Sequence, residues 1–179
     1  VLEIDTCKKS GNNHIHIGRV VSGKIARGDR VRTVVDEKKR HAICRNHSAT
    51  HLLHAALRSL LGEHVEQRGS LVDSQRLRFD FSHLDSLTNR QLRDIEISVN
   101  NKIINNVNVE ISQMSIEMAR EQGAMALFGE KYGDIVRVVH IGGDHSVELC
   151  GGTHVKCSGE IGPIKIIGEY GVASGIRRI

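Results

Sequence analysis

Two short segments of the chain combine imidazoles and a thiol at spacings that suit a metal ion. His47 and His51 stand four residues apart in HSATH, and residues four apart lie on the same face of a helix. Cys150 and His154 bound the segment CGGTH, whose two glycines allow the backbone to turn tightly. Three imidazoles and one thiolate form a tetrahedral ligand set that suits Zn²⁺. We therefore predict that these four residues converge on one zinc ion.

Two neighbouring residues compete for the same ion. His54 lies one turn beyond His51 and could replace His47 as a ligand, and Cys157 follows His154 by three residues. We interpret both as structural side chains. The chain has four Cys and no secretion signal, which argues against a disulfide framework.

The predicted elements must bring these two segments together. Residues 46–61 have a helical apolar period, with Asn46 as a plausible N-cap and Gly62 as a stop signal. Leu77, Phe79 and Phe81 alternate with polar residues, as in a half-buried strand. A second helix is expected from Thr88, where Thr88 and Gln91 form a capping-box pattern.

Further strands are expected at 107–112, 135–141, 145–149 and 163–168, with a short helix near 115–122. Strands mixed with a few helices, without a βαβ rhythm, predict an α+β fold with a mostly antiparallel sheet.

The N-terminal segment has a different pattern. Residues 14–35 read as short strands between glycine turns, which predicts a small β-barrel subdomain over residues 1–40 that is incomplete in this chain. The charged run at 36–40 is interpreted as a linker. The main domain is then expected at 41–179.

Charge and composition narrow the class of protein. The formal net charge is +4, and residues 1–45 hold eleven Lys and Arg against five acids. A basic end suits contact with a polyanion, although a solvated, Lys-rich surface would have the same excess of positive charge. No apolar run reaches the roughly 20 residues that cross a bilayer, and no signal segment is present. We expect a cytoplasmic location and no membrane partner.

Five segments, in order, resemble the editing domain of alanyl-tRNA synthetases. They are RNHSATHLLHAAL at 45–57, GSLV at 69–72, LRFDFSH at 77–83, ALFGEKYGD at 126–134 and CGGTH at 150–154. The resemblance continues through SGIRRI at the C-terminal end, and residues 1–40 resemble the small β-barrel that precedes the editing domain. Val1 is not an initiating Met, and we expect the chain to continue at both ends.

The resemblance implies an activity and a site. The family's zinc ligands fall on His47, His51, Cys150 and His154, and two positions linked with substrate recognition and editing fall on Thr50 and Gln67. The implied reaction is zinc-dependent hydrolysis of serine or glycine wrongly attached to tRNA for alanine. A serine hydroxyl could hydrogen-bond to Thr50, where an alanine methyl would leave polar groups unpaired; glycine is explained less well.

Two questions stay open at this point. A hydrolytic zinc usually keeps a position for water, so the metal either activates water beside four protein ligands or only shapes the pocket. The chain could also be a free-standing trans-editing deacylase, or a non-catalytic module in which zinc stabilises a tRNA-binding fold.

Overall fold

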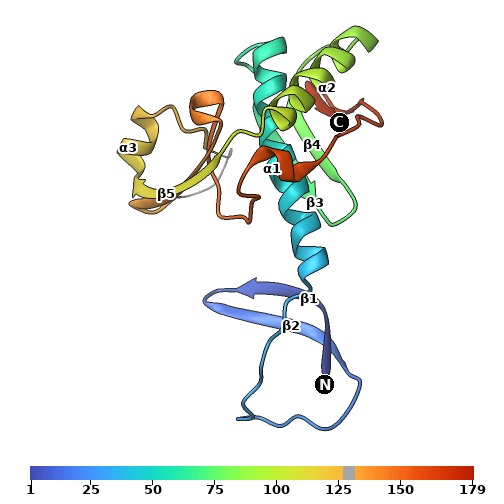
Figure 1. Ribbon diagram of the computed structural model, residues 1–179, viewed down its shortest axis with the longest axis vertical. Coiled ribbons are helices and arrows are strands. Elements are labelled where there is room, and N and C mark those ends of the chain that lie inside the picture. The colour runs from blue at the N-terminus through green and yellow to red at the C-terminus, as the bar shows by residue number, and fades with distance from the viewer. Residues whose placement is uncertain (127–131) are drawn as a thin grey trace. The chain divides into compact units, whose positions relative to one another are not determined.

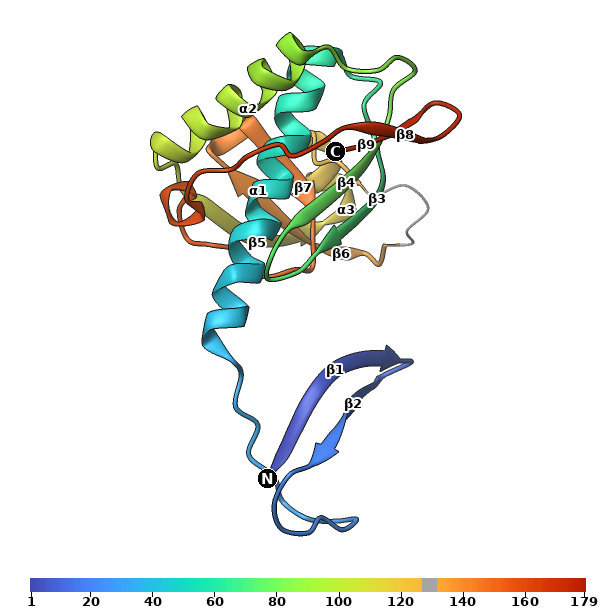
Figure 2. The same cartoon turned by 90° about the vertical axis from the view of Figure 1, so that its right-hand side faces the viewer.

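The chain forms two compact units, Val1–Val35 and Asp36–Ile179. The computed structural model describes residues 1–126 and 132–179, and Figures 1 and 2 show its elements from two sides. Each unit is described by itself. Among the described residues, none of the helices combines the length and the apolar character that a bilayer crossing requires.

The N-terminal unit is a β-hairpin followed by irregular chain. Strand β1 (Leu2–Ser10) pairs antiparallel with β2 (Asn13–Val20). Gly11 takes the turn with a φ of 57°, a backbone conformation that favours glycine. No strand is assigned from residue 21 to 35, and every residue of the unit is exposed. The small barrel expected over residues 1–40 is therefore not closed here, because two paired strands cannot form a closed sheet.

Helix α1 (Glu37–Leu61) is longer than the sequence pattern predicted. The predicted start at Asn46 is wrong: Asp36 caps the helix by accepting a hydrogen bond from the Lys39 N–H at 3.0 Å. The charged run at 36–40 was interpreted as a linker, but its residues are good helix formers and build the cap and first turn. Asn46 lies inside the helix and donates its side-chain amide to the Asp73 carbonyl at 2.7 Å.

Two antiparallel sheets complete the larger unit. One has the strand order β3-β4-β9-β8, formed by β3 (Gln67–Val72), β4 (Leu77–Ser82), β8 (Tyr170–Ala173) and β9 (Ile176–Arg178). The other has the order β5-β6-β7, formed by β5 (Val109–Ser115), β6 (Ile135–Ile141) and β7 (Ser146–Leu149). With the hairpin, the described residues hold three antiparallel sheets and an α+β fold.

The remaining helices are close to the predictions. Helix α2 (Asn89–Ile104) begins with the predicted capping box between Thr88 and Gln91, and α3 (Ile116–Glu121) is the predicted short helix. Two 3₁₀ turns, η1 (Gly143–His145) and η2 (Ser158–Ile161), follow β6 and the CGGTH segment.

The core of the larger unit fixes α1 against the sheets. Leu52, Leu57, Phe79, Phe81 and Ile95 are completely buried in one apolar cluster that joins α1, β4 and α2. Burying such side chains stabilises the fold by about 2 kcal/mol each. Ser48, His51 and His54 are also buried on α1, so the middle of this helix is covered on several faces.

The strand predicted at 163–168 is wrong, because these residues pair with the side chains of a helix. Asn100 on α2 accepts the Ile164 N–H at 2.9 Å and donates to the Ile164 carbonyl at 3.1 Å. Glu96 accepts the Ile166 N–H at 2.8 Å. The segment is extended, but its backbone groups are satisfied without a neighbouring strand.

This arrangement predicts that Asn100 contributes strongly to stability. The Asn100→Ala substitution leaves the N–H and C=O of Ile164 without these partners and should lower the free energy of unfolding by about 2 kcal/mol. Urea unfolding measures the effect, with the exposed neighbour variant Asn101→Ala as the control. Equal stability of the two variants would show that the segment is held by its apolar contacts alone.

Candidate metal centre

Two elements distant in sequence present the predicted ligands to one point. His47 and His51 project from α1, and Cys150 and His154 lie in the loop after β7. The Cys150 sulfur is 3.4 Å from His47 Nε2 and 3.4 Å from His154 Nε2. One ligand atom from each of the four residues lies within 4.8 Å of the other three. The structure therefore brings together the four side chains that the sequence singled out.

Two of the distances in this group match a shared tetrahedral ion. With Zn–S near 2.3 Å and Zn–N near 2.0 Å, sulfur and nitrogen ligands at the tetrahedral angle stand roughly 3.5 Å apart. The two S···N distances of 3.4 Å are close to this value. The four residues could bind a metal ion, and the mixture of thiolate and imidazole ligands is suited to zinc. His54 and Cys157 are outside the group.

Gly152 leaves the space that His47 occupies. A Cβ placed on Gly152 would lie 1.9 Å from His47 Cε1 and 2.3 Å from its Nδ1. A Cβ on Gly151 would meet no atom within 4 Å. The two glycines of CGGTH therefore differ: the imidazole packs directly on the backbone of the second one.

Each imidazole also has a partner on its outer side. His154 Nδ1 is 3.1 Å from the Ser48 hydroxyl, which also accepts the Val155 N–H at 3.2 Å. His51 Nδ1 is 3.4 Å from a carboxylate oxygen of Glu148, at ion-pair distance but without a hydrogen bond among the described residues. Metal-binding imidazoles generally have such outer partners, because these fix the ring and the nitrogen that carries the proton.

His47 is held in the same way by a backbone hydrogen bond with Thr153. The CGGTH loop thus contributes one predicted ligand, His154, and the backbone group that orients another, His47.

The environment of the cluster keeps its imidazoles neutral. Burial, with the nearby His51, lowers the pKa of His47 from 6.5 to about 4. Burial, with His51 and His47, lowers the pKa of His154 to about 2. Burial also lowers the pKa of His51, and the Arg137 guanidinium acts in the same direction on all three rings. Neutral imidazole is the form that binds a metal ion.

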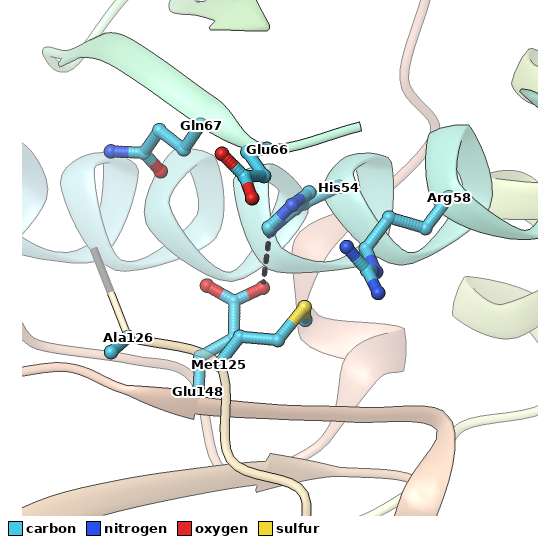
Figure 3. Close-up of a pocket in the computed structure, with 7 residues that line it drawn as sticks. All are labelled: His54, Arg58, Glu66, Gln67, Met125, Ala126 and Glu148. Carbon is cyan, nitrogen blue, oxygen red and sulfur yellow. Dashed lines mark hydrogen bonds and ion pairs between the residues drawn. The ribbon is translucent and has the colours of Figure 1, made fainter. Parts of the chain in front are cut away.

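Glu148 connects the metal centre to a neighbouring pocket. Its side chain is buried, and its second oxygen is 3.0 Å from His54 Nδ1. Burial opposes the charge of Glu148, but His51 and His54 favour it and lower the pKa of the carboxyl. Figure 3 shows the His54 ring facing this carboxylate across the pocket. The carboxylate therefore touches one predicted ligand and one pocket imidazole.

The pocket has a volume of about 240 Å³. Gln67 on β3 and Glu66, the residue before this strand, line one part of it, and His54 and Arg58 from α1 line another (Figure 3). The His54 Nε2 is buried and has no hydrogen-bond partner among the described residues. Polar groups from two elements thus converge on a space that Glu148 shares with the metal centre.

The two other predicted site residues have different surroundings. Gln67 lines the pocket, and its amide is 3.4 Å from the Ser70 hydroxyl. Thr50 is buried, and its hydroxyl donates to the Asn46 carbonyl at 2.8 Å. The Thr50 oxygen can therefore act only as an acceptor while this bond persists. Residues 127–131 of the ALFGEKYGD segment are outside the described residues.

The sequence reasoning missed Glu148, Ser48 and Arg137. Glu148 lies in the short strand β7, whose four residues are all buried, and Ser48 lies within helix α1. Only Ser48 had a local signal, since it lies between the two histidines of HSATH. The contacts of the other two residues depend on the tertiary fold.

Comparison with known proteins identifies the chain's family. Residues 136–179 match the threonyl and alanyl tRNA synthetase second additional domain. The chain is 57% identical to the alanine–tRNA ligase of Saccharophagus degradans over 177 residues, which cover 99% of the chain and 20% of that protein. The chain corresponds to a region of alanyl-tRNA synthetases that contains this domain. The residues matched by the family model include Cys150 and His154. The match to the ligase covers nearly the whole chain, so it also includes α1, which contains His47 and His51.

Other alanine–tRNA ligases give the same result. The ligase of Hydrogenovibrio crunogenus is 57% identical over 98% of the chain, and that of Clostridioides difficile is 54% identical over 100% of it. The chain spans about one fifth of the length of each of these synthetases.

The packing of His47 on Gly152 predicts that the two glycines respond differently to substitution. Gly152→Ala should displace His47 and weaken zinc binding roughly 10- to 100-fold, the range for changes that disturb ligand orientation. Gly151→Ala is the matched control. Competition with a chromophoric chelator measures both affinities; a Gly152→Ala variant that binds zinc as tightly as the control would contradict the geometry.

The lowered imidazole pKa values predict how the chelator-stripped protein responds to acid. Below pH 6.5 the unfolded chain binds protons at His47, His51 and His154 that the folded chain does not accept, so stability falls as the pH drops from about 6.5 towards 4. Each such group adds a slope of up to about 1.4 kcal/mol per pH unit. Chemical unfolding at several pH values measures the slope, and His154→Asn should reduce it. A constant stability from pH 7 to pH 5 would be inconsistent with buried neutral imidazoles.

Proposed function

We propose that the unit Asp36–Ile179 is a zinc-dependent editing site that hydrolyses serine or glycine from wrongly charged tRNA for alanine. The proposed zinc ligands are His47, His51, Cys150 and His154. The observation that carries the proposal is the meeting of these ligands beside a polar pocket, in a chain 57% identical to an alanine–tRNA ligase. The proposed setting is the cytoplasm, where the tRNA is charged.

A hydrolytic site that is separate from the amino-acid-selecting site is needed because selection by size and polarity alone is not accurate enough. A pocket that accepts alanine cannot exclude the smaller glycine by size. It also rejects an added hydroxyl by only about a hundredfold. An enzyme that charges tRNA with alanine therefore needs a separate step that removes these errors.

The reaction is the addition of water to the ester that joins the amino acid to the terminal ribose. The acyl C–O bond breaks, the hydroxyl of water joins the acyl carbon, and the ribose oxygen takes the proton. A bound zinc ion would supply Lewis acidity and lower the pKa of a bound water to about 7.

The chain's own residues would position the reactants around that ion. Ser48 would orient His154 through its hydroxyl, and Glu148 would place a negative charge beside His51. Gln67 and the unpartnered His54 Nε2 supply polar groups for the substrate in the adjoining pocket. The buried Thr50 oxygen is the acceptor that a serine hydroxyl would use, provided that the substrate reaches it.

The rival is a non-catalytic module in which zinc only stabilises a tRNA-binding fold. It shares the same ligand cluster, so binding of zinc alone does not distinguish the two functions. Hydrolysis does.

Deacylation of serine-charged tRNA tests the proposal directly. The chain should release serine in a zinc-dependent manner, and Cys150→Ala should lower the rate at least about 100-fold together with the zinc content. Circular dichroism and thermal unfolding show whether the variant is folded, and Cys7→Ala on the exposed hairpin is the control. A folded, zinc-free and fully active Cys150→Ala protein would exclude the zinc-dependent mechanism. A zinc-loaded wild type without activity would favour the non-catalytic module.

A further inference from the structure

A groove with unpaired positive charges borders the metal centre on the side of the α1 amino-terminal turns. One wall is formed by Arg40, His41 and Arg45 on α1, and the other by the segment 153–156 of the loop after β7. The groove has a volume of about 580 Å³, and all of its lining residues belong to the larger unit. His154, one of the proposed zinc ligands, is part of its wall.

The charge of the groove is not balanced within the fold. Arg40, Arg45 and Lys156 are exposed, and within the described part of the chain none of them pairs with a carboxylate. Among the described residues that line the groove, Glu160 is the one carboxylate. Elsewhere on the unit, Arg177 contacts Glu169 and Arg178 contacts Asp80.

Such an arrangement attracts a polyanion. Charges of one sign along a concave surface concentrate the local field and raise the concentration of oppositely charged ligands there. Three cations on two facing walls can contact successive phosphates, as in grooves that follow a single strand of nucleic acid. The described lining contains no Phe, Tyr or Trp, so the recognition would be of the backbone and not of the base sequence.

The position of the groove suggests which part of an RNA it would hold. A strand in the groove contacts the loop that contains His154, so its end lies beside the metal centre. The groove volume falls in the range of small-ligand sites, roughly 300 to 1,000 Å³, and suits a few nucleotides at most. We infer that Arg40, Arg45 and Lys156 bind the phosphates of the single-stranded 3′ end of an aminoacylated RNA and direct its ester to the metal centre. This inference rests on the proposed function.

Salt dependence of RNA binding tests the inference without hydrolysis. The probe is an uncharged, fluorescein-labelled, single-stranded RNA of about eight nucleotides, and fluorescence anisotropy follows its binding to the zinc-loaded chain between about 50 and 200 mM KCl. Each phosphate contact on a single strand contributes about −0.7 to the slope of log K against log salt. Arg45→Gln and Lys156→Gln should each reduce the slope by about 0.7 and weaken binding about threefold or more at low salt.

A matched control carries the same charge change at a distant surface. Arg90→Gln on α2 removes an exposed cation that pairs with Asp94, and it should leave the slope unchanged. Groove variants with the slope and affinity of this control would overturn the inference. If the groove variants lose affinity for a blunt RNA duplex to the same extent, the claim that the groove selects a single strand is overturned. That result would point to a general attraction of polyanions.

Kinetics with serine-charged tRNA separate this inference from the proposed function. The groove variants should raise KM with little change in kcat, since the groove binds the strand and not the reacting atoms. Their zinc content should match the wild type. If the wild type fails to hydrolyse the ester but the slopes change as expected, the editing proposal fails while the groove remains an RNA site. If hydrolysis is normal and KM does not change, the groove is not used.

Discussion

The larger unit is organised by the requirement that four ligand atoms from two distant segments meet at one point. His47 sits against Gly152 at a distance that excludes any side chain on the glycine, so α1 and the loop after β7 can approach in few ways. The apolar cluster around Leu52, Phe79 and Ile95 holds α1 in the position that allows this contact. The apolar core therefore fixes how the two segments that carry the predicted ligands approach each other.

The meeting of the four predicted ligands also places polar side chains in buried positions beside the apolar core. Glu148 is a buried carboxylate, and such a group is costly unless it is paired. It is placed between His51 and His54, so one charge serves the metal centre and the neighbouring pocket. The groove beside the centre has a different character, because exposed Arg45 and Lys156 have no carboxylate partner within the described residues. A buried, paired carboxylate and an open, basic groove thus both border the site.

The sequence predicted the parts of this structure that depend on local spacing. The ligand pairs and the Thr88 capping box are encoded within a few residues, and both are present. The start of α1 could have been predicted from Asp36, but the apolar period, which begins later, was the stronger signal. The segment 163–168 looked like a strand, and its pairing with Asn100 could not be predicted because the partner is a helix side chain. Contacts of Glu148 likewise depend on the packing of β7 against α1.

X-ray absorption at the zinc edge tests the central claim most directly, because it counts the ligands by element. The account predicts one zinc ion per chain with one sulfur near 2.3 Å and three nitrogens near 2.0 Å. Two sulfur ligands, as Cys157 or Cys44 would supply, or a site without sulfur, would contradict the proposal that His47, His51, Cys150 and His154 form the metal centre.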